Sequence, residues 1–264
     1  MAVIINNAQV HNMQIGPTIT TKGLVSCWDV ASVHSYPRTG NVWYDLGRNQ
    51  NNGSLSYMSV SNFVEDSSGA SFTLNGSDEY ITVPDEDSLN MNASSFSIIL
   101  WLKIPTGTLS ASSTYLIGKR GLSGSGNAGW SISIQGTSDH WLLSSAGVSD
   151  GTNSSAITLS ASSAFYDTWY MMSFTYDSTN KKMYYYQNEL QQGYRNFSGI
   201  TIGSISNTIP LEIFGTMYRG GTLYPELESI TAGSISSLAI HRECLTFDDI
   251  MSTYLLTKDK HLNM

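Results

Sequence analysis

Short runs of strand-forming residues recur along almost the whole chain, and this spacing constrains the fold more than any other feature. From Gly23 onward, runs rich in Val, Ile, Tyr, Phe and Trp alternate with clusters of Gly, Ser, Asn and Asp. Such spacing is typical of a sandwich or barrel built from many short strands. The strands predicted in this way are 24–30, 70–74, 80–83, 95–104, 115–119, 129–135, 140–144, 156–159, 169–177, 182–187, 200–203, 211–218 and 233–241.

Within these runs, apolar and polar residues often alternate, which predicts that one face of the strand is buried. In the run 129–135 the apolar positions are Trp130, Ile132 and Ile134. By the same rule, Tyr184 and Tyr186 are expected to share a face opposite to Tyr185. We interpret the three tyrosines as two core residues and one surface residue rather than as a stacking platform.

The two ends of the chain differ from its centre. Residues 1–22 turn polar and break at Gly16-Pro17, so we interpret them as an arm that precedes one domain of residues 23–264. They lack the basic start of a signal peptide, and their short apolar run is no transmembrane segment. Near the other end, Thr246 and Asp249 fit a capping box with Asp in place of Glu, which predicts a short C-terminal helix.

The charge of the chain excludes some classes of partner. Thirteen basic and 21 acidic residues give a formal net charge of -8, and charged residues make up only 13% of the chain. No run of Lys or Arg could follow a phosphate backbone. We therefore expect a neutral, hydrogen-bonding surface that binds neither nucleic acid nor an anionic membrane and does not insert into one.

The sequence offers no recognisable catalytic constellation. Glucanases with a jelly-roll fold would place Glu-x-Asp-x-Glu on one strand, and this chain has no such triplet. Its acidic cluster 85–87 follows Pro84, where a solvated turn is expected. The five histidines are scattered without metal-ligand spacing, and no Gly-x-Ser-x-Gly elbow occurs. A non-enzymatic protein is therefore expected.

Sugar binding would need exposed aromatic rings, because a pyranose face stacks on a ring while neighbouring polar groups bind its hydroxyls. Trp28, Trp101 and Trp169 lie on apolar runs and are predicted to be core residues. The remaining candidates for ligand binding are Trp43, Tyr44, Trp141, Tyr194 and Tyr218.

Four segments, in order, resemble the concanavalin A-like, laminin-G-like jelly-roll domains that structural proteins of tailed bacteriophages carry. The segments are GLVSCWDVASVHSYPRTGNVWYDLGRNQNNGSL, SFTLNGSDEYITVPDEDSLNMNASSFSIILWLKI, DTWYMMSFTYDSTNKKMYYYQNEL and GSISSLAIHRECLTFDDIMSTY. Together they span about residues 23–256, and the middle of the chain matches by pattern only. The resemblance implies an all-β fold, a two-sheet antiparallel jelly-roll sandwich with one short C-terminal helix.

The resemblance also bears on metal binding and on one turn. Some relatives use calcium, and Asp45, Asn49 and Asn52 lie in a loop rich in oxygen ligands, so calcium is the one ion we consider. The alternative is that Asp and Asn occur here because they suit tight turns. Gly47-Arg48 departs from the usual Ser-Gly of this loop and weakens the parallel. Asn188-Glu189 replaces an expected Asn-Gly, which predicts a hairpin turn longer than two residues.

Three functions follow as hypotheses. The first is a virion surface structural protein, a capsid decoration or tail-associated module, assembled in the host cytoplasm. Its arm of residues 1–22 would bind other virion proteins, and it would form a homo-oligomer or part of a symmetric assembly. The second is a stand-alone carbohydrate-binding module that recognises a glycan. The third is a polysaccharide-degrading enzyme whose carboxylate pair comes from different strands.

Overall fold

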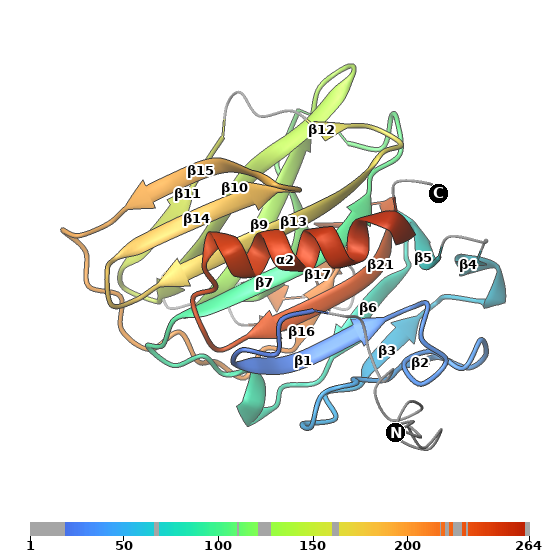
Figure 1. Ribbon diagram of the computed structural model, residues 1–264, viewed down its shortest axis with the longest axis horizontal. Coiled ribbons are helices and arrows are strands. Elements are labelled where there is room, and N and C mark those ends of the chain that lie inside the picture. The colour runs from blue at the N-terminus through green and yellow to red at the C-terminus, as the bar shows by residue number, and fades with distance from the viewer. Residues whose placement is uncertain are drawn as a thin grey trace, which may run out of the picture.

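Two antiparallel sheets pack face to face, and one helix lies on the outer face of one of them (Figure 1). The computed structural model describes residues 19–65, 69–109, 111–120, 128–159, 164–216, 218–219, 222–223, 229–230 and 232–261. This arrangement confirms the predicted all-β sandwich with a short C-terminal helix. None of the helices in these ranges is long and apolar enough to cross a membrane.

The sheet that carries the helix, here called the helix-side sheet, has the strand order β15-β14-β13-β7-β21-β5-β4, with β1 also paired to β21. Its strands are β1 (Leu24–Asp29), β4 (Phe63–Glu65), β5 (Ala70–Asn75), β7 (Phe96–Lys103), β13 (Trp169–Asp177), β14 (Lys182–Gln187), β15 (Leu190–Asn196) and β21 (Ala232–His241).

The second sheet has the order β11-β10-β9-β8-β16-β6-β3-β2, with β12 also paired to β10. Its strands are β2 (Val42–Trp43), β3 (Gly53–Ser56), β6 (Tyr80–Val83), β8 (Thr114–Lys119), β9 (Ala128–Gly136), β10 (His140–Asp150), β11 (Ser154–Ile157), β12 (Ala164–Phe165) and β16 (Leu211–Ile213). Two short ribbons pair β17 (Gly215–Thr216) with β20 (Ser229–Ile230) and β18 (Tyr218–Arg219) with β19 (Thr222–Leu223). The 3-10 turns are η1 (Val60–Asn62), η2 (Asp87–Leu89) and η3 (Lys258–Lys260).

Inward-facing side chains of both sheets form the main core. Trp130, Ile132 and Ile134 of β9 are all buried there, as their alternation predicts. Residues 200–203 were predicted to form a strand but do not. Conversely, the strand β15 and the short strands β2 to β4 were not predicted. Short polar strands such as β15 carry little hydrophobic pattern, so pairing with a neighbour decides their conformation.

The helix α2 (Phe247–Thr257) lies across the outer face of the helix-side sheet and creates a second core there (Figure 1). Its first turn has the predicted capping box, because the Thr246 side chain accepts from the Asp249 backbone while Asp249 Oδ2 accepts from Thr246 N at 2.9 Å. Ile99 and Trp101 of β7 pack against it, while Ile98 and Leu100 face the main core. Burial on both faces accounts for the continuous apolar sequence of β7.

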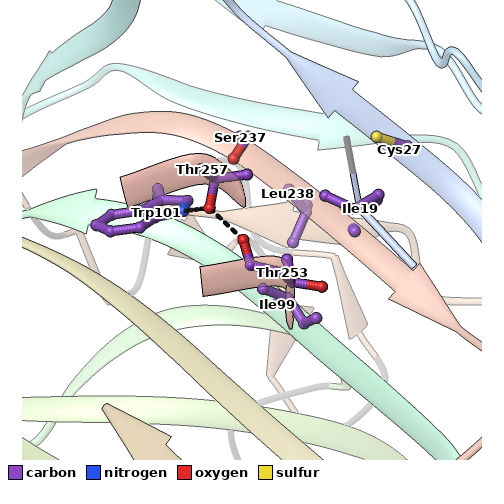
Figure 2. A pocket seen from close by; sticks show the side chains of 9 residues that line it. Ile19, Cys27, Ile99, Trp101, Ser237, Leu238, Thr253 and Thr257 are labelled. Atoms are coloured by element: carbon purple, nitrogen blue, oxygen red, sulfur yellow. Dashed lines mark hydrogen bonds between the residues drawn. The ribbon is translucent and has the colours of Figure 1, made fainter. Parts of the chain in front are cut away.

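Residues 19–22, the end of the predicted arm, pack on the body of the domain. The carbonyl of Lys22 lies 2.9 Å from His241 Nδ1, and Lys22 Nζ lies 3.4 Å from Asp249 Oδ2. Ile19 lies beside α2 (Figure 2). Residues 1–18 lie outside the described ranges, so the arm stays a prediction.

Candidate binding surface

Two of the predicted sugar-binding aromatics are core residues, and the prediction is wrong for them. Trp43 on β2 packs against Trp28 and Phe72, with ring centroids 6.2 and 5.4 Å away. Trp141 on β10 lies 6.0 Å from Tyr170. Neither indole exposes more than 1% of its surface, because both strands turn these side chains between the sheets, so no ring face is open to a sugar. Trp28, Trp101 and Trp169 are buried as predicted.

The other candidates differ in position. Tyr44 is 41% exposed and follows β2 at one end of the second sheet. Tyr194 is 47% exposed and lies on β15, the last strand at one end of the helix-side sheet. Figure 1 places β15 and β2 at opposite ends of the molecule, so these two tyrosines cannot belong to one site. The side chain of Tyr218 lies outside the described part of the structure.

Tyr194 is the end of a continuous line of rings, here called the aromatic row, formed by Tyr194, Tyr184, Tyr186 and Phe247. Successive ring centroids are 5.2, 6.3 and 6.1 Å apart. Cross-strand pairing of Tyr184 with Tyr194 places both rings on the outer face, and Phe247 belongs to the first turn of α2. The row therefore runs from the sheet edge to the helix.

As predicted, Tyr184 and Tyr186 share a face opposite to Tyr185, but the interpretation that they do not form a stacked arrangement is wrong, because their rings lie stacked with centroids 6.3 Å apart. Tyr185 is buried in the main core, and Tyr186 is buried on the opposite face against α2. Tyr184 is half-buried between Tyr186 and Tyr194. Burial raises the pKa of Tyr186 to about 12, with Tyr184 as a smaller cause, so its hydroxyl stays neutral. The ends of the row, Tyr194 and Phe247 at 44% exposure, are its solvent-facing rings.

The strands beneath the row are held firmly at the β14–β15 turn. Asn188 N donates to the Met171 carbonyl at 2.8 Å, and Met171 N donates to Asn188 Oδ1 at 2.9 Å. Asn188 takes a positive φ of 54°, and pairing of Gln187 with Leu190 leaves only two turn residues. The prediction of a longer turn is therefore wrong, because Asn accepts the left-handed conformation here and Glu189 does not have to.

The Asp45 carboxylate organises its own loop. Its Oδ1 accepts from Cys27 N at 2.8 Å and from Gly47 N at 2.7 Å, and its Oδ2 accepts from Asn51 N at 3.1 Å. Asn52 Oδ1 accepts from Asp45 N at 3.0 Å. Burial raises the pKa of Asp45, and the backbone hydrogen bonds partly offset this. The geometry gives the carboxylate a structural role.

The same loop completes the free side of β1. Leu46 N donates to the Cys27 carbonyl at 2.7 Å, and Asn49 Nδ2 donates to the Val25 carbonyl at 2.7 Å. The loop thus supplies the hydrogen bonds that a further strand would make. Among the described residues there is no group of three or more His, Cys, Asp or Glu able to hold a metal ion. Calcium binding by Asp45, Asn49 and Asn52 stays a hypothesis.

Comparison with known proteins identifies the family. Residues 41–224 match the family model described as Clostridium neurotoxin, N-terminal receptor binding. The chain belongs to this family of N-terminal receptor-binding domains. No curated protein sequence matches it. The two-sheet fold expected from the laminin-G-like resemblance is confirmed, whereas a phage origin stays a prediction.

Solved structures of two binding domains share the fold. The binding domain of Paraclostridial Mosquitocidal Protein 1 is 15% identical with a TM-score of 0.63, and the match covers 88% of this chain and 52% of that one. The binding domain of botulinum neurotoxin serotype G is also 15% identical, with a TM-score of 0.64 and coverage of 88% and 51%. The chain therefore spans about half the length of these binding domains.

A Trypanosoma rangeli sialidase in complex with sialic acid is similar as well, with 16% identity, a TM-score of 0.59 and coverage of 92% of this chain and 34% of the enzyme. Likeness at this identity shows the fold alone. The neurotoxin family model describes a receptor-binding domain rather than a catalytic one.

The structure also contains a buried lysine, Lys119, that no sequence pattern indicated. Lys119 Nζ lies 2.5 Å from Asp85 Oδ1 and donates to the Asn207 carbonyl at 2.9 Å and to Asn90 Oδ1 at 3.2 Å. Burial lowers the pKa of Lys119, and Asp85 partly offsets this. Asp85 is thus not in a merely solvated turn, and the cluster ties the β6–β7 and β15–β16 connections to the end of β8.

A small pocket lies between α2 and the helix-side sheet of this neurotoxin-family fold (Figure 2). Trp101 Nε1 donates to Thr257 Oγ1 at 2.9 Å, and Thr257 Oγ1 donates to the Thr253 carbonyl at 2.7 Å. The titratable group in its wall is the thiol of Cys27, whose pKa is raised by burial. The Trp101, Thr253 and Thr257 side chains in its wall are paired with each other or with the α2 backbone, so we regard the pocket as a packing gap and the aromatic row as the better candidate surface.

Proposed function

We propose that the chain is a non-catalytic receptor-binding domain that recognises a glycan through the aromatic row. The observation that carries the proposal is the pair of solvent-facing rings, Tyr194 and Phe247, at the ends of a line of packed tyrosines. The family to which the chain belongs supports a binding role, since its model is named for receptor binding.

The row has the physical properties that sugar recognition needs. The ring of Tyr194 is held by Tyr184 behind it, so it loses little side-chain entropy when a pyranose stacks on it. Lys182 and Asn196 face each other one step along the same two strands, on the same side as Tyr184 and Tyr194. Their side chains supply a donor and an amide for the sugar hydroxyls.

The test is a glycan array probed with the full chain and with Tyr194→Ala. Loss of one stacking ring is worth about 1 kcal/mol, so the variant should bind its glycans about five-fold more weakly. Tyr44→Ala is the matched control, because Tyr44 is nearly as exposed and lies at the other end of the molecule. Loss of binding in Tyr44→Ala with none in Tyr194→Ala would refute the role of the row.

A second proposal places the domain on the surface of a tailed-phage particle assembled in the host cytoplasm, as a decoration or tail-associated module. It is supported by the four resembling segments and by the attachment of residues 19–22 beside α2, which would give a preceding arm a fixed exit point. Electron cryo-microscopy of particles should then find the protein at symmetric positions, with residues 1–22 on a neighbouring virion protein. Particles that lack it would refute the proposal.

An enzymatic role is the remaining alternative, and the sialidase likeness is the observation that favours testing it. We expect no release of sialic acid or of reducing ends when the chain is incubated with sialylated and capsular glycans. Turnover that persists through repeated purification would contradict the non-catalytic proposal.

A further inference from the structure

A second pair of tyrosines lies on the other sheet, and one of them has an unusual backbone. Tyr57, immediately after β3, exposes 75% of its surface and has a φ of 58°. This left-handed conformation costs a residue other than Gly or Asn about 1 kcal/mol. The chain therefore accepts backbone strain at the position where it presents a large ring to solvent.

The ring of Tyr57 has a partner. Tyr80 begins β6, pairs with Ser56 of β3, and its ring centroid lies 6.2 Å from that of Tyr57. Ile81 and Val83 of β6 point into the main core, so Tyr80 points outward. The tyrosine pair therefore lies on the outer face of the second sheet, opposite to the aromatic row on the outer face of the helix-side sheet.

The segment after Tyr57 is rigid enough to hold the ring in place. Ser59 N donates to Asn62 Oδ1 at 2.7 Å, and Asn62 Nδ2 donates to the Thr73 carbonyl of β5 at 2.8 Å. Met58 packs against the main core. Tyr57 lies between the end of β3 at Ser56 and this anchored turn, so its backbone has little freedom to move the ring out of solvent.

Polar groups surround the pair on the same face. Ser54, Ser56 and Thr82 alternate outward on β3 and β6, and Ser54 pairs with Thr82. The Thr82 hydroxyl is buried and has no hydrogen-bond partner among the described residues. A ring platform beside the Ser54 and Ser56 hydroxyls matches the needs of a sugar better than those of an apolar protein surface, and the enclosed Thr82 hydroxyl takes no part in it.

We propose that Tyr57 and Tyr80 form a second stacking platform for a saccharide, so that one domain holds two glycans at once on opposite faces. The inference rests on the proposed glycan-binding function for its ligand class, but its residues are separate from the aromatic row. A domain with two such sites would cross-link glycans on a surface and gain affinity through multivalency.

The experiment uses the full chain in native gels that contain galactomannan, xyloglucan or yeast mannan, followed by calorimetry with hexasaccharides of the polymer that retards it. The variants are Tyr57→Asn, Tyr194→Ala and the double variant. Asn tolerates positive φ, so Tyr57→Asn removes the ring while its melting temperature stays at or above that of the wild type. We expect two sites in the wild type, one of them weakened about five-fold in each single variant, and the weakest retardation for the double variant, in which both sites are weakened.

The outcomes separate the two proposals. If Tyr57→Asn binds both sites with wild-type affinity, the second platform is refuted and the aromatic row stands. If Tyr194→Ala binds both sites with wild-type affinity while Tyr57→Asn weakens one of them, the row is refuted and the platform stands. A wild-type chain that no polymer retards contradicts both.

Discussion

The Asp45 loop offers the sharpest test of the structural reasoning. Asp45→Ala removes the acceptor for three backbone N–H groups, those of Cys27, Gly47 and Asn51. A buried donor left unpaired costs about 1–3 kcal/mol, and water can reach part of the loop, so the free energy of unfolding should fall by roughly 2 to 5 kcal/mol. For a chain of this size, that lowers the melting temperature by roughly 5 to 15 °C.

The assay is urea unfolding followed by tryptophan fluorescence, with thermal unfolding in parallel. Asp45→Asn is the matched control, because its one amide oxygen can still accept and should retain about half of the lost stability. Neutral surface substitutions change the free energy of unfolding by up to about 0.5 kcal/mol. If Asp45→Ala differs from the wild type by no more than this, the structural role of Asp45 is refuted.

The same variants test the calcium hypothesis. A bound ion at 100 times its Kd stabilises the folded state by about 2.7 kcal/mol, so a calcium site would raise the melting temperature of chelator-treated wild type by several degrees. Because the loop's own N–H groups already occupy the Asp45 oxygens, we expect no shift. A calcium-dependent rise that Asp45→Ala abolishes would overturn this expectation.

Three further predictions concern stability. Burial lowers the pKa of His261 from 6.5 to about 4, so between these values the unfolded chain binds a proton that the folded chain excludes. The free energy of unfolding should therefore fall by roughly 3 kcal/mol as the pH drops from 6.5 to 4, relative to a His261→Phe variant. A difference between the two proteins that does not depend on pH would contradict this prediction. Thr246→Ala removes the helix cap and should cost about 1 kcal/mol in urea unfolding, whereas no change would show the cap to be idle. Asp85→Ala leaves the Lys119 ammonium buried without its carboxylate and should lower the free energy of unfolding by about 3 kcal/mol. Glu86→Ala, in the same loop, should leave it unchanged, and equal effects of the two variants would refute the ion pair.

Local patterns predicted much of the fold because they depend on local physics. The runs 80–83, 169–177 and 182–187 coincide with β6, β13 and β14, since β-branched and aromatic residues with turn residues at both ends suit few other conformations. The cap at Thr246 is equally local. The turn at Asn188 was mispredicted, because its contacts with Met171 on another strand help select the conformation.

The candidate surface was predicted only in part. Tyr194 was among the candidates, but alternation shows which residues share a face and not what covers that face. The same rule could not separate the buried Trp43 and Trp141 from exposed rings. Phe247 completes the row from the far end of the chain, and no local signal connects it to Tyr186.

The sequence alone determined the fold class, the inward faces of the long strands and the start of the last helix, because strand period and capping act over a few residues. Only the tertiary structure decided which aromatic rings reach solvent, because α2 covers one outer face of the sandwich in part. It also decided that Asp45 completes an edge strand and that Asp85 pairs with a buried lysine. Those roles depend on partners that the chain brings together only when the two sheets and their loops have assembled.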